Sequence, residues 1–455
     1  MYKFIIAWIL LMPAMASAQD KDVYAIYEQQ YRRLLNERGV SETEISKILK
    51  TYSASNIKDD KSLAELLGKI YSGKKGIALL FYFFNNDTLR RAFYYPGRVV
   101  EVKSMAITKD RLIGLKDNIN SGLNLYNLAR DRSPLQRGNI TISKPASHSS
   151  YKKAVGNAAR ILLPDNFSTS IKHLVIVPAL NIGTIPFHLL PVNGKDLIEQ
   201  CSFTVVPSLV DMVALRTRIL KKNISSWDGK ELPASFDADE QFSALDKKAF
   251  HIKKALLVSN PAYPKDSVFS FPDLPGAEKE VLAAIPYAEQ HYLLKGSDAK
   301  KATVKQRLQD CNLAWFATHG IADQQEPMTK SFLVLGEPEP YLTAKEIMQL
   351  HNYSGSMPEM VILSACQTGL GKSMEAGTAG LARSFLLGGS SHVIMSLWNV
   401  DDEATAYFMS RFVYYLQQEH PFMPSEQLRL ATLDTRKKFS HPSKWASFSL
   451  FGIDY

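Results

Sequence analysis

The sequence predicts an α/β protein with a mostly parallel sheet flanked by helices and arranged as two tandem α/β halves. In the second half, short apolar segments alternate with helical ones, and such alternation is typical of a parallel sheet covered on both faces. The first half has buried-strand signals of its own, at 173–178 and 202–206. The chain has 455 residues, of which 45% are hydrophobic and 22% charged, which excludes wholesale disorder.

The first eighteen residues have the layout of a targeting signal. Lys3 precedes an apolar run over 4–15, and Ala16-Ser17-Ala18 places small residues at both recognition positions before Gln19. This is the pattern of a cleavable signal peptide, and the apolar run is shorter than the ~20 residues that a membrane span needs. We therefore expect a periplasmic or secreted protein that begins at Gln19.

The remaining chain divides into four parts. A helical segment comes first, with apolar residues at helical spacing in 24–35 and 63–70 and with Asp60 or Ser62 as the expected cap of the second helix. The first α/β half opens with a hairpin or small meander over 77–102. A polar stretch rich in Ser, Asp, Gly and Pro is expected to be a linker or mobile loop. The expected boundaries are 19–75 for the helical segment, 76–221 for the first half, 222–250 for the linker and 251–455 for the second half.

The second half contains a regular series of expected elements. Its helices include one that follows the acidic residues near 401, and its final strand lies close to the end of the chain. The expected strands are 255–259, 290–294, 313–317, 332–335, 360–363, 392–397 and 448–450, and the expected helices are 276–285, 302–309, 343–350, 379–387, 403–417 and 425–438.

Two residues with useful chemistry follow strands of this series. His319 comes just after the strand 313–317, and Cys366 just after the strand 360–363. Ligands of parallel sheets bind beyond the carboxyl ends of the strands, so both side chains are expected at one edge. A thiol with a pKa of about 8.5 needs a neighbouring imidazole to react efficiently near neutrality. The N–H groups of Gly320 and Cys366 could together stabilise an oxyanion.

A set of ordered motifs extends this pattern. They include LPGAEKE at 274–280, FATHG at 316–320, LSACQTGLG at 363–371 and SLWNVDDEAT at 396–405, with further matches at 175–190, 342–347, 380–385 and 441–452. Together they resemble the CHAT domain, a bacterial branch of the caspase-like cysteine peptidases related to caspases, gingipains and separases. The resemblance covers roughly residues 76–455.

The resemblance implies a caspase-like fold in which 76–221 is a degenerate companion of the catalytic half, 251–455. It implies a cysteine endopeptidase with Cys366 as nucleophile, His319 as general base and acid, and the Gly320 and Cys366 amides as oxyanion donors. CHAT domains usually follow a tetratricopeptide array, but 19–75 is too short for about three 34-residue repeats. A regulatory partner could act without that array, but the sequence does not identify one. It does not name a third catalytic residue either.

The acidic pair Asp401 and Asp402 has two interpretations. Related separases place an acidic residue near this motif to receive a basic side chain, so cleavage after Arg or Lys is one hypothesis. Alternatively, the carboxylates cap the helix that begins near 403, where the helix dipole favours negative charge. Both interpretations can hold together.

Other functions have weaker support. The net charge of +9 is too mild to indicate nucleic acid as a partner. Gly369 and Gly371 lack the spacing of a phosphate-binding loop, and the histidines show no metal-ligand spacing, so neither a cofactor nor a metal is expected. Cys201 and Cys311 could pair outside the cell or remain buried free thiols. The main alternative to a peptidase acting on a protein or peptide is a catalytically idle, peptidase-like interaction module.

Overall fold

The structure is a computed structural model. It describes residues 23–36, 42–71, 74–123, 125, 148–223, 250–265, 269, 271–323, 326–350, 357–364, 373–374, 377–378, 380–398, 400–418 and 423–454. The expected signal peptide, nearly all of the expected linker and Cys366 lie outside these residues.

One eleven-stranded sheet runs through both halves of the chain, in the order β3-β2-β1-β4-β7-β18-β17-β14-β10-β8-β9. Seven of its ten neighbouring pairs are parallel, which confirms the mostly parallel α/β prediction. Its strands are β1 (Ile77–Asn85), β2 (Thr88–Tyr95), β3 (Arg98–Ala106), β4 (His173–Val177), β7 (Ser202–Val205), β8 (Ile252–Pro261), β9 (Ala288–Gly296), β10 (Leu313–Ala317), β14 (Met360–Leu363), β17 (His392–Ser396) and β18 (Phe448–Gly452).

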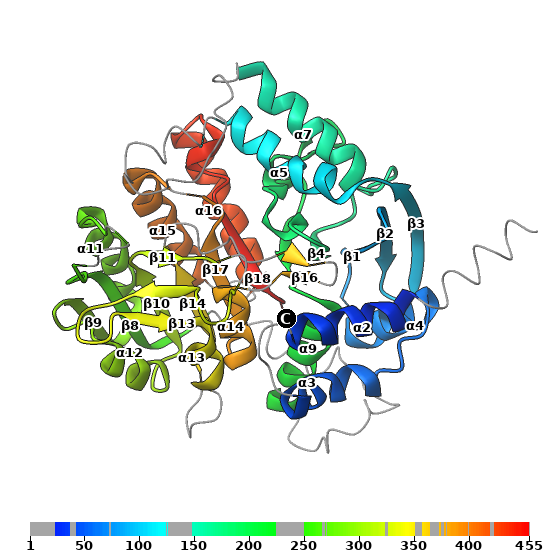
Figure 1. The fold of residues 1–455 in the computed structure, drawn as a ribbon. Coiled ribbons are helices and arrows are strands. Elements are labelled where there is room, and N and C mark those ends of the chain that lie inside the picture. The colour runs from blue at the N-terminus through cyan, green and yellow to red at the C-terminus, as the bar shows by residue number, and fades with distance from the viewer. Residues whose placement is uncertain are drawn as a thin grey trace, which may run out of the picture.

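The last strand joins the two halves. β18 runs antiparallel to β17 and pairs in parallel with β7, so the last strand of the chain lies in the middle of the sheet (Figure 1). At the far edge, β1, β2 and β3 form an antiparallel meander with a tight turn at Asn86 and Asp87, both at positive φ. This confirms the meander expected over 77–102.

Helices cover both faces of the sheet. They are α2 (Val23–Asn36), α3 (Glu42–Ala54), α4 (Asp60–Ile70), α5 (Lys109–Gly122), α7 (His148–Leu162), α8 (Leu197–Gln200), α9 (Leu209–Asn223), α11 (Pro275–Val281), α12 (Lys301–Leu308), α13 (Ala344–Gln349), α14 (Leu381–Gly388), α15 (Asp402–Leu416) and α16 (Pro424–Lys438), with 3-10 turns at Ile182–Thr184, Phe187–Leu189, Leu282–Tyr287 and Pro442–Lys444.

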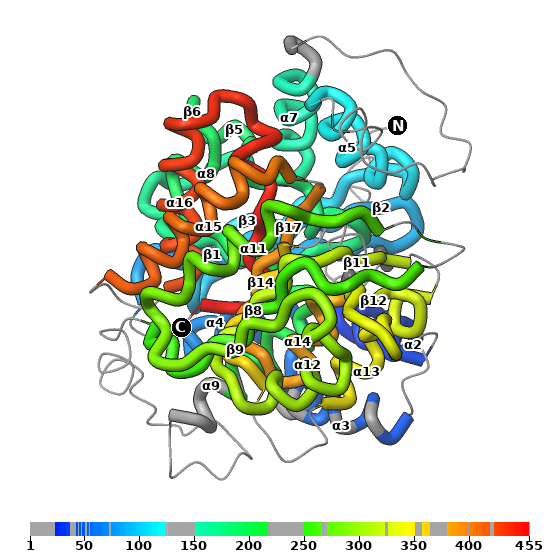
Figure 2. Tube along the Cα trace, turned by 90° about the vertical axis from the view of Figure 1, so that its left-hand side faces the viewer, coloured from blue at the N-terminus to red at the C-terminus, as the bar shows by residue number. Residues whose placement is uncertain are grey.

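The alternation of side chains along β10 explains the layering of the second half. Ala314 and Phe316 belong to a core with residues of α12, α13 and α14, whereas Trp315 lies in a second core with residues of α11, α15 and α16. Successive residues of a strand point to opposite faces, so a strand buried on both sides is apolar throughout. Figure 2 shows α11, α15 and α16 on one side of β8 and β14, with α12 and α13 on the other.

Several expected boundaries were wrong in detail. The cap of α4 is Asp59, whose side chain accepts from the Ser62 N–H at 2.7 Å in a capping box; neither Asp60 nor Ser62 is the N-cap. The helix expected over 276–285 ends at Val281 and continues as a 3-10 turn that contains Pro286, because proline lacks the N–H that an α-helix requires.

Three small sheets lie outside the main one in the part of the chain that the structure describes. The segment expected as a strand over 332–335 belongs to a separate sheet in the order β11-β12-β13. The strands of these small sheets are β5 (Pro191–Val192), β6 (Lys195–Asp196), β11 (Gly320–Ile321), β12 (Phe332–Val334), β13 (Tyr341–Thr343), β15 (Ser373–Met374) and β16 (Gly377–Thr378).

Candidate active site

The two strands that lead to the predicted catalytic pair are neighbours in the sheet. β10 and β14 pair in parallel, from Leu313 opposite Met360 to Phe316 opposite Leu363. The chain leaves both strands at the same edge, where the Ser364 N–H donates to the Phe316 carbonyl at 3.0 Å. The expectation that one sheet edge receives both segments is therefore confirmed for the strands. Cys366 lies two positions after Ser364 and outside the described residues, so its placement stays a prediction.

His319 has a defined hydrogen-bond partner. Its Nε2 lies 2.7 Å from the carbonyl oxygen of Pro272, which precedes α11. A carbonyl only accepts hydrogen bonds, so the ring donates from Nε2 and the lone pair of the neutral imidazole lies on Nδ1. The orienting group that the sequence could not name is thus available from a backbone carbonyl. No side-chain type marks such a group, and therefore no motif search would have found it.

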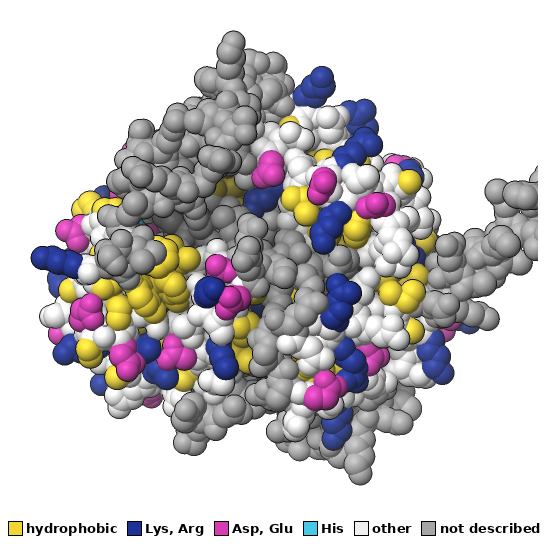
Figure 3. All heavy atoms as spheres, viewed as in Figure 1, with side chains coloured by type: hydrophobic (Ala, Val, Ile, Leu, Met, Phe, Trp, Pro, Cys, Tyr) yellow, Lys and Arg dark blue, Asp and Glu magenta, His cyan; other side chains and the backbone are white. Residues whose placement is uncertain are grey.

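Aromatic side chains surround the imidazole. The Tyr263 and Phe271 ring centroids lie 4.8 Å and 5.5 Å from that of His319, and the cluster continues through Phe332 and Tyr341, whose rings are 4.4 Å apart. Figure 3 shows hydrophobic side chains gathered on this face of the molecule, over β10 and β13. Burial lowers the pKa of His319, although the Pro272 carbonyl acts in the opposite direction. The imidazole is therefore neutral near pH 7, as a general base must be.

Gly320 is the first residue of the short strand β11. It lies opposite Leu333 of β12, and the Val334 N–H donates to the His319 carbonyl at 2.9 Å. Hydrogen-bonded and non-hydrogen-bonded pairs alternate in an antiparallel ladder, so the Gly320 N–H is turned away from β12. This geometry suits the predicted oxyanion donor, while the second donor, the Cys366 amide, lies outside the described residues.

The two acidic residues, Asp401 and Asp402, have different surroundings. Asp401 is the N-cap of α15, accepting from the Ala404 N–H at 3.0 Å, and its other carboxylate oxygen lies 3.6 Å from the Lys444 ammonium. The capping interpretation is therefore confirmed for Asp401. Asp402 is the first residue of α15, is exposed and lies beside Gly276 of α11. A substrate-binding role for either residue stays a prediction.

The other two cysteines differ from a reactive thiol. Cys201 and Cys311 are buried and free, which agrees with the unpaired alternative. Burial raises the pKa of each thiol to about 12, so both are protonated at neutral pH. Because the thiolate is the nucleophile, neither is expected to react with an alkylating reagent in the folded protein.

Two features are absent from the described part of the chain. No helix there is long and apolar enough to cross a bilayer. Within the same residues, no group of three or more His, Cys, Asp or Glu side chains could hold a metal ion.

Comparison with known proteins places these features in a family. The family model of the CHAT domain matches residues 153–453. Tetratricopeptide repeat protein 28 of Homo sapiens is 24% identical over 373 residues, which cover 71% of this chain and 14% of that protein. The chain therefore spans about a seventh of the length of this curated relative.

Solved structures of a separase share the fold. The separase–securin complex of Saccharomyces cerevisiae aligns with a TM-score of 0.51 and 13% identity, over 93% of this chain and 33% of that chain. The Arg specific cysteine proteinase gingipain R aligns with a TM-score of 0.41 and 10% identity, over 75% of this chain and 74% of that chain.

Proposed function

Because the chain belongs to the CHAT domain family, we propose that it is a cysteine-type endopeptidase with Cys366 as nucleophile and His319 as general base. The observation that carries this proposal is the hydrogen bond from His319 Nε2 to the Pro272 carbonyl. It orients the ring and leaves Nδ1 to take a proton, at the sheet edge where β14 leads toward Cys366.

The reach of the chain supports the same pairing. Ser364 follows β14 directly, and two residues can extend by at most about 7 Å. Cys366 is therefore tethered near the edge at which His319 follows β10. The neutral imidazole expected from the lowered pKa of His319 can accept a thiol proton at this edge.

The reaction would proceed in two stages. His319 Nδ1 takes the proton of the Cys366 thiol, and the thiolate sulfur bonds to the scissile carbonyl carbon while the Gly320 and Cys366 N–H groups stabilise the oxyanion. The imidazolium then protonates the leaving amine, the C–N bond breaks and a thioester remains. A water molecule, deprotonated by His319, attacks the thioester and releases the acid and the thiol.

A preference for Arg or Lys before the cleaved bond is part of the proposal. Asp402 is exposed at the start of α15 and is the candidate to receive a substrate cation. Cleavage of a peptide library by the parent and by Asp402→Asn tests this idea. An unchanged preference in the variant would exclude Asp402 as the determinant.

Export is also proposed, from the pattern of the first eighteen residues. Expression of the full chain in a bacterial host, followed by sequencing of the amino terminus of the product, provides the test. A product that begins at Gln19 supports export, and one that retains Lys3 contradicts it.

The central experiment identifies new amino termini in a denatured protein mixture treated with the parent, with Cys366→Ala or with the matched control Cys311→Ala. The proposal expects new termini from the parent and from Cys311→Ala only. Termini produced equally well by Cys366→Ala would refute it. A parent that cleaves nothing, and whose Cys366 reacts with iodoacetamide no faster than an unfolded thiol, would instead favour the idle interaction module.

A further inference from the structure

A buried carboxyl lies beside the strand that leads to His319. Glu280 is on α11, and its side chain is buried with 7% of the residue exposed. Buried carboxyls are rare unless they have partners. The helix that carries Glu280 begins three residues after Pro272, the residue whose carbonyl accepts from His319. Glu280 therefore belongs to the same segment that orients the imidazole.

The carboxyl binds the strand that leads to His319. Its Oε1 accepts from the Trp315 indole N–H at 2.9 Å, and Trp315 lies in β10 four residues before His319. The Ser364 hydroxyl acts on the same carboxyl and favours its ionised form, as does the indole. Ser364 lies two residues before Cys366. One hydrogen bond of this carboxyl thus joins α11 to β10.

The charged group that acts on the Glu280 carboxyl is itself acidic. Across from it, α15 contributes Asp402, a like charge that opposes ionisation. A Cβ placed on Gly276 would lie 2.9 Å from Asp402 Cβ, so glycine lets the first turn of α11 approach α15 this closely.

The remaining charges on these elements lie elsewhere. On α11 itself, Glu278 pairs with Lys295 at the surface, 2.7 Å away, and Lys279 is exposed. On β8, which also contacts α11, Lys253 is exposed and Lys254 pairs with Asp310. β10 has no ionisable side chain. None of these cations is among the groups that act on the Glu280 carboxyl.

Resting on the peptidase function proposed above, we propose that Glu280 is a positioning residue that holds α11 against β10, the strand that leads to His319, and that gain of a proton by its carboxyl weakens this hold. An ionised carboxylate accepts from the Trp315 indole, and charge-assisted hydrogen bonds are roughly twice as strong as neutral ones. Burial raises the pKa of Glu280 to about 7, so the change falls in the neutral range.

The first measurement follows the titration of Glu280 through the fluorescence of its hydrogen-bond partner, Trp315. Indole fluorescence is followed from pH 5 to 9 in the parent, in Glu280→Gln and in Trp315→Phe. The proposal expects an inflection near pH 7 in the parent that is lost in both variants. An inflection retained in Glu280→Gln, or absent from the parent, would refute the assigned titration without reference to any peptidase activity.

The second measurement follows the rate at which iodoacetamide alkylates Cys366, read by mass spectrometry over the same pH range. Glu280→Gln preserves the shape of the side chain and cannot ionise, so its rate is expected to fall about fivefold at pH 8 and less than twofold at pH 6. Trp315→Phe, which removes the donor to the same carboxyl, provides a second variant with an expected loss at pH 8. Glu278→Gln is the matched control, because it removes an exposed carboxylate from the same helix, and it is expected to match the parent.

The outcomes separate the two proposals. A parent with a fast Cys366 and a Glu280→Gln profile identical to it would refute the positioning role while leaving the peptidase intact. A parent whose Cys366 reacts no faster than a thiol in the urea-unfolded chain would refute the peptidase and, with it, the positioning role.

Discussion

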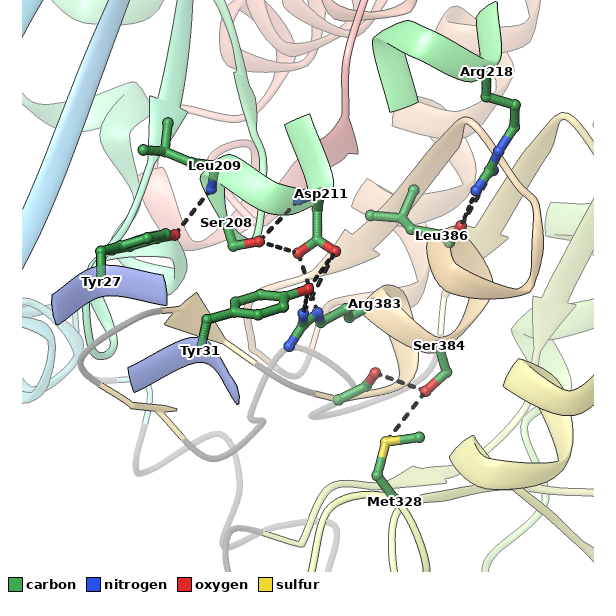
Figure 4. A network of polar contacts seen from close by, with 11 residues as sticks. Tyr27, Tyr31, Ser208, Leu209, Asp211, Arg218, Met328, Arg383, Ser384 and Leu386 are labelled. Carbon is green, nitrogen blue, oxygen red and sulfur yellow. Dashed lines mark hydrogen bonds and ion pairs between the residues drawn. The ribbon is translucent and has the colours of Figure 1, made fainter. Parts of the chain in front are cut away.

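A buried ion pair joins the amino-terminal helices to the second half of the chain. Arg383 of α14 lies 3.2 Å from Asp211 of α9, measured from Nε to Oδ2, and the two side chains are only 4% and 3% exposed. Tyr31 of α2 donates to Asp211 at 3.2 Å and accepts from Arg383. Figure 4 shows these side chains converging from three helices, with Ser208 also donating to Asp211 at 2.6 Å.

Replacing Arg383 with Met should destabilise the protein strongly. Removing one partner of a buried ion pair costs about 3–5 kcal/mol, because the remaining charge has no compensation. Asp211 would keep the hydrogen bonds from Tyr31 and Ser208, so we expect a loss near the lower end, about 3 kcal/mol. Adding Asp211→Asn to this variant removes the stranded charge and should restore part of that loss.

Urea unfolding of the full chain at pH 7 measures both effects. The matched control is Arg411→Met, which breaks a pair with Asp434 whose side chains are 30% and 17% exposed. Pairs near the surface contribute at most about 1 kcal/mol. A loss for Arg383→Met no larger than that of Arg411→Met, or losses in the double variant that simply add, would refute this account.

Three further predictions concern the site. The pKa of Glu280 is raised from 4.5 to about 7, so the free energy of unfolding of the parent falls as pH rises from about 4.5 to 7. Glu280→Gln should escape this loss. At pH 8 its free energy of unfolding in urea should exceed that of the parent by up to about 3 kcal/mol. His319→Gln should slow alkylation of Cys366 at pH 7 by about tenfold or more, because no imidazole then takes the thiol proton, and an unchanged rate would contradict the proposed pair. Asp401→Ala removes the cap that accepts from Ala404 and should cost about 1 kcal/mol, whereas Asp401→Asn should cost little; equal losses in thermal melts would argue against capping.

Most of the sheet could be predicted because its strands carry a local signal. The apolar segments at 313–317 and 360–363 coincide with β10 and β14, since strands buried on both faces are apolar throughout. The helix caps were less predictable: Asp59 rather than Asp60 caps α4. Asp60 instead accepts from the Tyr24 hydroxyl at 2.7 Å and pairs with Arg90 of β2, a partner that no local pattern indicates.

The candidate site, too, could be predicted only in part from the sequence. The strand-end positions of His319 and Cys366 follow from the sequence alone, and so does the glycine after His319. The orienting carbonyl of Pro272 does not, because it is a backbone group 47 residues away from His319. The burial of Glu280 could not be predicted either, since a Glu in a short helix with an exposed face is usually solvated.

The sequence by itself determined most strands and helices of the second half and the His319, Gly320 and Cys366 motif, because each depends on side chains that are close together in the chain. Only the tertiary structure decided that β18 returns between β7 and β17, that Pro272 and Glu280 support the site, and that Arg383 contacts Tyr31 across 352 residues of sequence. Such contacts depend on which distant segments share a buried volume, where each polar group must find a partner.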